Sequence, residues 1–500
     1  MALSLAAVWK ALGGGHWPWD DLPLASVVVD SRLVTPGSLF VALPGEHTDG
    51  HEFVADAFRR GAYAALVQRP LLDCDCYQLP VAGFQLDNSQ APRERGEGLV
   101  TADRLLSEAL PICFLVPNTL DALHQLAAYW RSLHLNCRVV GVTGSVGKTT
   151  TKELIAAVLR QRFTTLKSPG NYNNEIGLPL TMLQLHPAVE WIVQEMGMYA
   201  LGEIAHLASI ARPEIGVVTN VGPTHLERLG SIERIAQAKS ELVQALPGDG
   251  LAVLNGDDDR VRRMAALSKA KNVLYYGLQS HNDLWASDVQ TYGLQGLRMT
   301  FHFRGQSVSA QLPLLGQHSV YGALAAATVA LGGATGMTWD EVIAGLRDSS
   351  AEMRVKVLPG VRGATILDDT YNANPASTVA ALDLLSEMNG RKVAVLGGML
   401  ELGSYEEEGH RVVGRRAAEV AALLVTVGRL GRLIASEAVA SGMPAQAVLA
   451  VADNDAAVAL LLPMLQKGDF VLVKGSRGFA MESVVARLID MDKTAEAGGV

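Results

Sequence analysis

The sequence predicts an α/β protein of three domains. Its 500 residues correspond to about three domains of ~100–200 residues each. Short apolar runs alternate with amphipathic segments, a pattern typical of a parallel sheet covered by helices. A third observation is a glycine-rich turn between a strand and a helix in the middle of the chain. We place the domains at residues 1–137, 138–350 and 351–500, with the glycine-rich turn opening the central one.

The composition excludes several classes of protein. The net charge is −9 and there is no long basic run, which argues against nucleic acid as the main partner. The four cysteines show neither zinc-ligand spacing nor a disulfide framework, so a reducing compartment is expected. No apolar run approaches the ~20 residues of a membrane span, and residues 1–15 lack the charged start of a signal peptide. We therefore expect a soluble, cytoplasmic protein without a membrane span, and a monomer.

The first segment reads as strands and helices around one interruption. We expect strands and helices in the order Val27–Val29, Leu39–Ala42, Phe53–Arg60 (helix), Ala64–Val67, Ile112–Val116 and Leu120–Leu133 (helix). Between them, residues 71–109 are polar and irregular. This stretch is interpreted as an insertion or a long surface loop.

The stretch from Val139 to Leu159 has the layout of a phosphate-binding loop. An apolar strand, Val139–Val142, leads into Gly144-Ser145-Val146-Gly147, and Lys148, Thr149 and Thr150 open an amphipathic helix. Glycines let backbone N–H groups surround phosphate oxygens, and the helix N-terminus adds positive potential. Lys148 would reach the outer phosphates and the Thr149 hydroxyl would bind Mg²⁺. The competing interpretation, an ordinary strand-to-helix turn, is disfavoured by the flanking strand and helix.

Polar residues recur at the ends of further central strands. Glu195 follows the strand Trp191–Gln194, His225 follows Ile215–Val221, and Asn255 and Asp257 follow Leu251–Leu254. Ligands bind beyond the carboxyl ends of such strands. Any one of these residues could be a surface residue or a helix cap, but together they favour a nucleotide and Mg²⁺ site.

Lys239 lies on the apolar stripe of a helix predicted over Ser231–Leu246. One interpretation is that its stem covers the stripe while its ammonium reaches water. Because the helix follows His225 closely, we favour a buried lysine directed at the metal region. A desolvated lysine has a lowered pKa and becomes a nucleophilic amine.

The last segment starts another α/β unit. A strand at Thr365–Leu367 is followed by Asp369 and Asn374, a helix is expected over Thr378–Met388, and a strand over Val393–Leu396 precedes a glycine-rich loop. The strand Phe470–Val473 ends in Lys474-Gly475-Ser476-Arg477-Gly478. A cationic, glycine-rich turn suits anionic ligands, although an ordinary solvated turn is the alternative.

Taken together, these motifs resemble the Mur ligases over nearly the whole chain. They are DSRLVTPGSLFVALPGEHTDGH (30–51), TGSVGKTTTKE (143–153), GNYNNEIGLPLT (170–181), THLERLGS (224–231), LDDTYNANPAS (367–377), LGGMLELG (396–403) and LVKGSRG (472–478). The resemblance implies a UDP-substrate domain, a central P-loop ATPase domain and a C-terminal Rossmann-like domain. It further implies an ATP-dependent peptide ligase of peptidoglycan precursor synthesis. The substrates implied are UDP-N-acetylmuramoyl-tripeptide and D-alanyl-D-alanine, joined through an acyl phosphate and a tetrahedral intermediate.

The resemblance also implies roles for individual residues. Lys148, His225 and Lys239 would be catalytic, and two Mg²⁺ ions would be held by Thr149 and Glu195 and by His225 and Lys239, the lysine as a carbamate. ATP contacts are implied for Gly144, Ser145, Val146, Gly147, Lys148, Thr149, Thr150, Asn255, Asp257, Arg354 and Asp369. Substrate contacts are implied for Ser31, Arg32, Asn374, Lys474 and Arg477.

Three positions depart from the family pattern. His318-Ser319-Val320-Tyr321-Gly322 lacks the two asparagines usual near the adenine. Gly398 replaces an aspartate and Lys356 replaces a glutamate. None of these removes the phosphate loop, the metal ligands or the lysine.

Four alternatives remain at this point. One is the family member that adds the third residue of the stem peptide, although its Asp-Asn-Pro-Arg motif is missing here. Another is a folylpolyglutamate-type ligase, which the 30–51 motif disfavours. The others are a P-loop small-molecule kinase and a nucleotide-switched binding module. Phosphate release that depends on an added amine separates a ligase from the last two.

Overall fold

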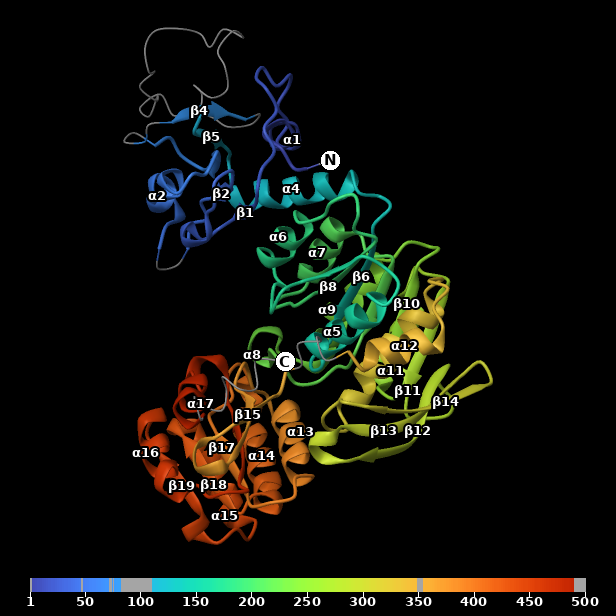
Figure 1. The fold of residues 1–500 in the computed structure, drawn as a ribbon, viewed down its shortest axis with the longest axis vertical. Helices are drawn as coiled ribbons and strands as arrows, with labels where there is room; N and C mark the ends of the chain where they lie inside the picture. Colours follow the sequence, from blue (N-terminus) through green and yellow to red (C-terminus); the bar gives the residue numbers. More distant parts are fainter. Residues whose placement is uncertain are drawn as a thin grey trace. The chain divides into compact units, whose positions relative to one another are not determined.

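The computed structural model describes residues 2–45, 48–71, 74, 76–81, 110–348 and 354–489. Their contacts divide the chain into two units (Figure 1). The first contains Met1–Val139, Thr164–Met196 and His206–Pro213, and the second contains Val140–Phe163, Gly197–Ala205 and Glu214–Val500. Both consist of helices around parallel-rich sheets, so the predicted α/β class is confirmed. The predicted boundaries at residues 137 and 350 stay a prediction.

The first unit contains a five-stranded sheet in the order β1-β2-β3-β5-β4. All four strand pairings are parallel. The central strands are apolar and fully buried, as expected for a sheet covered on both faces. The elements of this part are α1 (Leu5–Ala11), β1 (Val27–Val28), η1 (Ser31–Leu33), β2 (Leu39–Val41), η2 (Gly50–Phe53), α2 (Val54–Arg59), β3 (Ala64–Val67), β4 (Tyr77–Pro80), β5 (Ile112–Leu115) and α4 (Thr119–Ser132).

The interpretation of residues 71–109 as one irregular loop is wrong at its start. Tyr77–Pro80 forms β4, which pairs in parallel with β5 through Tyr77 and Ile112. Its partly exposed residues and terminal proline suit an edge strand, and that polar composition hides it from a search for apolar runs. Residues 82–109 lie outside the described part of the chain.

A second group of elements in the first unit is built around α4. These elements are β7 (Thr165–Lys167), α6 (Gly177–Met182), β8 (Trp191–Glu195) and most of α7 (Glu203–Ala211). β7 pairs in parallel with β8, with Thr165 opposite Trp191. Trp130 of α4 anchors the group, because its Nε1 donates a hydrogen bond of 2.9 Å to the carbonyl of Leu185.

The second unit contains strands in the order β14-β13-β12-β11-β10-β9-β6. From β6 to β12 every pairing is parallel. The strands are β6 (Arg138–Thr143), β9 (Ile215–Val218), β10 (Leu251–Asn255), β11 (Asn272–Gly277), β12 (Leu284–Thr291), β13 (Leu297–Phe303) and β14 (Gln306–Leu312). The accompanying helices are α5 (Lys148–Leu159), α8 (Leu226–Leu229), α9 (Ile232–Ala245), α10 (Asp259–Arg263), η3 (Met264–Leu267), α11 (Ser319–Gly332) and α12 (Trp339–Leu346).

The prediction of a parallel central sheet needs one correction. β12 pairs antiparallel with β13, and β13 with β14. Arg304 and Gly305 both have positive φ, of 49° and 79°, and join β13 to β14 in a tight hairpin. Positive φ at both turn positions matches the twist of antiparallel strands. Arg-Gly is a weaker hairpin signal than Asn-Gly, which explains why the hairpin is missing from the sequence prediction.

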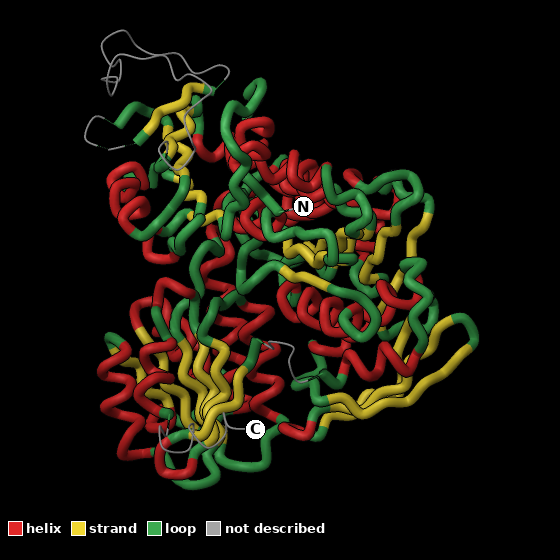
Figure 2. The backbone as a smooth tube through the Cα atoms, turned by 45° about the horizontal axis from the view of Figure 1, so that its top comes forward, coloured by secondary structure: helices red, strands yellow, loops and turns green. Residues whose placement is uncertain are grey.

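The C-terminal part of the second unit is a six-stranded sheet in the order β15-β16-β20-β17-β18-β19. Its strands are β15 (Lys356–Pro359), β16 (Thr365–Asp369), β17 (Lys392–Leu396), β18 (Leu423–Val427), β19 (Val448–Val451) and β20 (Phe470–Lys474). Its helices are α13 (Pro375–Ser386), α14 (Glu406–Val420), α15 (Gly428–Ala440), α16 (Asn454–Met464) and α17 (Glu482–Leu488). Alternate strand residues face two separate apolar cores, one with α13, α14 and α15 and the other with α16 and α17. Helices lie on both sides of this sheet (Figures 1 and 2). This doubly covered sheet matches the expected Rossmann-like arrangement.

Across the described ranges, no helix is both long and apolar enough to cross a lipid bilayer.

Candidate functional site

The glycine-rich turn has the shape that its sequence predicts. β6 ends at Thr143 and α5 begins at Lys148. Gly144 and Gly147 have φ of +148° and +84°, which favour glycine. A Cβ on Gly144 would lie 1.8 Å from Oγ1 of Thr219, so no side chain fits there without a shift. The turn therefore packs so closely against Thr219, in the segment that directly follows β9, that only glycine fits at position 144 without a shift.

That segment holds the turn in place, which the sequence alone did not indicate. Asn220 Oδ1 accepts from the Val146 N–H at 2.9 Å, and Asn220 Nδ2 donates to the Val146 carbonyl at 2.9 Å. Thr219 Oγ1 donates to the same carbonyl at 2.7 Å. Ser145 Oγ donates to the Gly222 carbonyl at 3.0 Å. The conformation of the turn is thus fixed by several side chains before any ligand arrives.

Lys148 folds back over the turn. Its Nζ donates to the Gly144 carbonyl at 2.8 Å. Thr149 and Thr150 stand in the first turn of the twelve-residue α5, whose N-terminus has a positive potential from the helix dipole. A fixed glycine turn, a lysine and a helix N-terminus together form a binding site for phosphate groups.

Two further basic side chains act on the same region. Lys239 is 2% exposed, which confirms the buried position predicted for it. Burial lowers the pKa of Lys239 well below its ordinary value, and the nearby charge of Lys148 lowers it further. Burial likewise lowers the pKa of His225, and Lys148 and Lys239 add to that effect against Glu401. The mutual effects place the three basic groups in one electrostatic neighbourhood, which favours anions.

Glu401 is a partner of His225 that sequence reasoning missed. Its Oε2 lies 2.8 Å from His225 Nδ1. Both residues have positive φ, 59° for His225 and 62° for Glu401. Tyr199 meets the His225 ring edge-on, with ring centroids 5.2 Å apart. The only hint in the sequence is that Glu401 lies in the glycine-rich loop after β17, because the contact itself depends on tertiary structure.

Glu195 ends β8 in the first unit, as predicted. It is 2% exposed, and its Oε1 accepts from Asn173 Nδ2 at 2.8 Å. Its backbone N–H donates to Ser168 Oγ at 3.1 Å. The carboxylate is therefore held in a defined orientation by its own unit.

The structure uses Asn255 and Asp257 to hold the loop after β10. Asn255 Nδ2 donates to the Thr219 carbonyl at 2.8 Å. Asp257 accepts from the Leu278 N–H at 2.6 Å, from Asn282 at 2.8 Å and from the Tyr321 hydroxyl at 3.1 Å. Burial and this carboxylate raise the pKa of Tyr321 to about 12. Both predicted ATP contacts thus have structural partners, and their contact with a nucleotide stays a prediction.

Lys474, predicted to contact the substrate from a cationic turn, is buried and paired within the protein, and its contact with a substrate stays a prediction. Its side chain is 1% exposed, and Nζ contacts Asp369 Oδ2 at 2.5 Å and the Asn372 carbonyl at 2.9 Å. The reason is that β20 lies inside its sheet, between β16 and β17, so the strand end is enclosed. Burial lowers the pKa of Lys474 while Asp369 opposes that shift. Lys474 therefore neutralises Asp369 within the protein.

The other predicted residues of the C-terminal part surround this pair. Arg354 Nε lies 3.7 Å from Asp369 Oδ1, and its guanidinium lies over the Tyr371 ring at 4.7 Å. Arg477 lies over the same ring at 6.0 Å. Asn374 is the N-cap of α13, because its Oδ1 accepts from the Ser377 N–H at 2.9 Å. Its side-chain oxygen thus has a structural role that the sequence prediction did not include.

Ser31 and Arg32 form the short η1 helix of the first unit. Ser31 is buried, whereas the Arg32 side chain is 81% exposed. Asp30 holds Arg32 through two parallel bonds, Nε to Oδ1 at 2.9 Å and Nη2 to Oδ2 at 2.7 Å. The hydrogen bond from Arg32 lowers the pKa of Asp30 to about 2.

The protein itself supplies only some of the ligands that a metal ion at this site would need. The described ranges contain no group of three or more histidine, cysteine or acidic side chains arranged to hold a metal. Mg²⁺ with a nucleotide takes most ligands from phosphates and water, so a hydroxyl such as that of Thr149 is a sufficient protein contact. A neutral His225 with its Nδ1 bound to Glu401 has the usual arrangement of a metal-binding histidine. The residues present therefore fit Mg²⁺ that arrives with a phosphate ligand.

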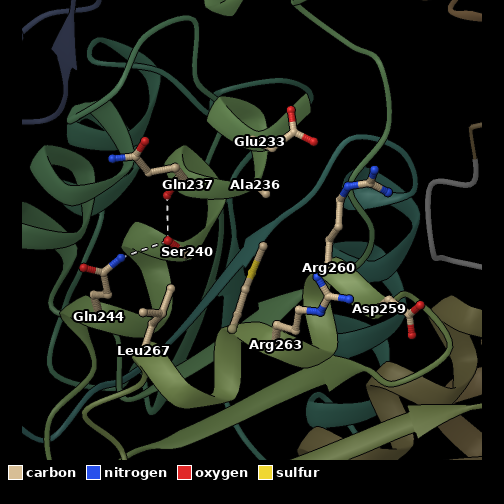
Figure 3. Close-up of a pocket in the computed structure, with 10 residues that line it drawn as sticks. Glu233, Ala236, Gln237, Ser240, Gln244, Asp259, Arg260, Arg263 and Leu267 are labelled. Atoms are coloured by element: carbon tan, nitrogen blue, oxygen red, sulfur yellow. Dashed lines mark hydrogen bonds between the residues drawn. The ribbon is translucent and has the colours of Figure 1, made fainter. Parts of the chain in front are cut away.

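A hollow of about 650 Å³ lies between α9, α10 and η3 and does not coincide with this site (Figure 3). Its lining includes Glu233, Gln237, Arg260 and Arg263 but neither Lys239 nor the glycine-rich turn. Ser240 donates to the Gln237 carbonyl at 2.7 Å and accepts from Gln244 at 2.9 Å on its wall. The hollow therefore lies along a different face of α9 from the one that carries Lys239.

The fold and the glycine-rich turn define a P-loop α/β protein whose site suits nucleotide phosphates. Family profiles match three successive parts of the chain: the Mur ligase family catalytic domain over residues 23–110, the Mur ligase middle domain over 142–330 and the Mur ligase glutamate ligase domain over 353–477. The chain belongs to the Mur ligase family, and it is an ATP-dependent ligase that forms amide bonds.

Individual relatives make the comparison more specific. The chain is 36% identical to the UDP-N-acetylmuramoyl-tripeptide–D-alanyl-D-alanine ligase of Synechocystis sp. over 95% of this chain and 94% of that protein. A crystal structure of MurF from Acinetobacter baumannii is 29% identical, covers 96% of this chain and 97% of that one, and has a TM-score of 0.79. MurF from Thermotoga maritima in complex with ADP is 30% identical, covers 92% and 96%, and has a TM-score of 0.73. The comparisons support use of ATP but give no support to the carbamate expected on Lys239.

Proposed function

We propose that this chain joins D-alanyl-D-alanine to UDP-N-acetylmuramoyl-tripeptide with ATP, giving the pentapeptide, ADP and phosphate. Relatives named for that activity align over more than nine-tenths of the chain. The reaction is that of peptidoglycan precursor synthesis, and we place it in the cytoplasm.

The observation that carries the proposal is the group of three basic residues around the glycine-rich turn. Beyond the effect of burial, Lys148 lowers the pKa of both His225 and Lys239, and Lys239 also lowers that of His225, so the region has a positive potential that the negative charge of a bound anion would relieve. ATP and a substrate carboxylate supply that charge. In a site with little water, such preorganised groups stabilise charge that develops during phosphoryl transfer.

The chemistry follows from the poor reactivity of a carboxylate. Its oxygen attacks the γ-phosphorus of ATP, ADP leaves, and the carboxylate becomes an acyl phosphate. The amine of D-alanyl-D-alanine then attacks the acyl carbon, and the tetrahedral intermediate expels phosphate as the amide forms. Lys148 would neutralise the transferred phosphoryl group throughout this step. Each ~1.4 kcal/mol of transition-state stabilisation raises the rate about tenfold.

Two Mg²⁺ ions belong to the proposal. Thr149 and Glu195 would hold the ion that accompanies ATP, and His225 would hold a second ion. When bound, these ions neutralise phosphate oxygens and polarise the phosphoryl group. Glu401 contacts His225 Nδ1 and so orients the ring, which would leave Nε2 to hold an ion.

Lys239 enters the proposal as a neutral amine. Its burial and its lowered pKa support that state. A neutral amine beside the transferred phosphoryl group donates a hydrogen bond without repelling the ions.

The remaining predicted residues would bind the nucleotide, the peptide and the UDP-sugar. We assign Arg354 and Asp369 to the nucleotide, and Arg477 and Asn374 to the peptide side. Ser31 and Arg32 would contact the UDP-sugar. The exposed guanidinium of Arg32 is suited to phosphate oxygens.

The test is phosphate release with a panel of substrates. We expect turnover only when ATP, the UDP-tripeptide and D-alanyl-D-alanine are all present. Equal turnover with UDP-dipeptide and a diamino acid would assign the chain to the step before. Turnover without any amine would indicate a kinase, and tight ATP binding without turnover would indicate a nucleotide-switched module.

A further inference from the structure

Three thiols meet at the edge of the five-stranded sheet in the first unit. Cys113 lies on β5 and is fully buried, and Cys74 and Cys76 precede β4 and are partly exposed. Cys76 Sγ lies 3.4 Å from Cys113 Sγ. Cys74 hydrogen-bonds to both of the others through its side chain. We refer to these three residues as the thiol trio.

The pairing of β4 with β5 explains why the trio forms. Tyr77 lies opposite Ile112 and Gln78 opposite Cys113, so Cys76, one residue before β4, lies diagonally across from Cys113 on the neighbouring parallel strand. The Tyr77 N–H also donates to the Pro111 carbonyl at 2.9 Å, which fixes the start of β4 beside β5. Neither residue has a place in the proposed ligation chemistry. The trio is therefore a separate chemical feature of the fold.

The protonation of the trio is uneven. Hydrogen bonds from Cys113 and Cys76 lower the pKa of Cys74 to about 4. Hydrogen bonds with Cys74 and Cys76, together with burial, raise the pKa of Cys113. One sulfur is thus a thiolate stabilised by two S–H donors, and thiolates are the form that reacts with oxidants.

We propose that the thiol trio is a reversible oxidation site in which a hydroperoxide converts two thiols to a disulfide that contains Cys113. The Cys74 thiolate attacks the terminal peroxide oxygen, the O–O bond breaks, and an alkoxide or hydroxide leaves and takes up a proton to become an alcohol or water, which gives a sulfenic acid on Cys74. Cys113 then attacks the Cys74 sulfur, the S–O bond breaks and water leaves. Cys76 can take the place of Cys74 by thiol–disulfide exchange, since it lies 3.4 Å from Cys113.

The resting state is the reduced one in a reducing compartment, and oxidation is transient there. A dithiol reverses the reaction by exchange and becomes the disulfide itself. A Cys76–Cys113 bond would close a covalent loop between residues 37 positions apart. It would link the start of β4 to β5 and so restrict separation of this sheet edge.

The test treats the full-length protein with limiting hydrogen peroxide, then counts thiols with a maleimide and maps disulfides by mass spectrometry. We expect the four thiols to fall to two, with loss of two hydrogens in the intact mass and recovery on addition of dithiothreitol. Mapped peptides should contain Cys113 joined to Cys74 or Cys76. The matched control is Cys137→Ser, because Cys137 lies buried elsewhere and contacts the Arg138 carbonyl. That variant should lose two thiols at the wild-type rate.

Cys113→Ser supplies the second arm. Combined with Cys76→Ser, it should accumulate a sulfenic acid that dimedone traps, because neither neighbouring thiol is left to resolve it. Its melting temperature in reducing buffer shows whether the variant folds. If the variant does not fold, the disulfides mapped in the oxidised wild-type protein test the proposal. A Cys74–Cys76 disulfide, or oxidation of Cys137 as fast as the trio, would overturn the inference.

Discussion

Replacing Gly144 with alanine should damage the glycine-rich turn more than any other single methyl group. The new Cβ would lie 1.8 Å from Thr219 Oγ1 and 3.2 Å from the Asn220 nitrogen. Thr219 must then rotate and lose its 2.7 Å bond to the Val146 carbonyl, at a cost of about 1 kcal/mol. A φ of +148° in a residue with a Cβ adds roughly 1–3 kcal/mol of strain.

These two costs act on the conformation of the turn rather than on a distant core. Together they come to about 3 kcal/mol, which corresponds to about a hundredfold lower kcat/KM for ATP if the catalytic conformation bears the whole cost. The assay is ATP-dependent phosphate release, with melting temperature measured in parallel. Calorimetric titration with ADP separates lost binding from lost turnover.

Gly147→Ala is the matched control. Gly147 also has positive φ, but a Cβ there meets no atom within 4 Å. It should suffer only the left-handed backbone cost of about 1–2 kcal/mol, or up to about thirtyfold in kcat/KM. Adding Thr219→Ala to Gly144→Ala should recover part of the loss by removing the clashing hydroxyl. If Gly144→Ala keeps kcat/KM within threefold of wild type, or Gly147→Ala is the more harmful, the account of the turn is wrong.

Three further predictions concern ionisable side chains. Lys239→Met should lower kcat about a hundredfold or more, while the melting temperature stays the same or rises. Wild-type Lys239 is neutral in the folded protein and protonated in the unfolded one, so the stability that Lys239→Met gains should shrink as pH rises towards the pKa of lysine in the unfolded chain. A gain that grows with pH would contradict this prediction. Glu401→Gln should reduce kcat by about 10–100-fold at saturating Mg²⁺, because the His225 ring loses its orienting carboxylate, and an unchanged rate would remove that role. Lys474→Met should cost about 3 kcal/mol of unfolding free energy in urea, because Asp369 stays buried with only the more distant Arg354, 3.7 Å away, as a charged partner. Adding Asp369→Asn should restore most of the loss, and additive losses would refute the pairing.

Local sequence determines the parts of the site that were predicted correctly. The turn at 144–147 depends on glycines at positions with positive φ, followed directly by a helix, and that information is contained within a few residues. The burial of Lys239 follows in the same way from its place on the apolar stripe of α9. Both features could be predicted because the residues that decide them are neighbours in the chain.

The missed features depend on which strands lie side by side. Asn220 holds Val146 because β9 is the neighbour of β6, although 74 positions separate the two residues. Lys474 is buried because β20 lies between β16 and β17, which no feature of its own segment reveals. Glu401 meets His225 across 176 positions. Sequence patterns predict each element, but the order of strands in a sheet is a tertiary property.

The most direct test of the central claim, activation of a carboxylate by phosphorylation at this site, is the path of a carboxylate oxygen. UDP-N-acetylmuramoyl-tripeptide labelled with ¹⁸O in its terminal carboxylate is incubated with the protein, ATP, Mg²⁺ and D-alanyl-D-alanine, and the released phosphate is weighed by mass spectrometry. The account predicts one ¹⁸O per phosphate, since the acyl phosphate leaves its bridging oxygen on phosphorus. Unlabelled phosphate, with the label retained in the peptide or the solvent, would contradict it.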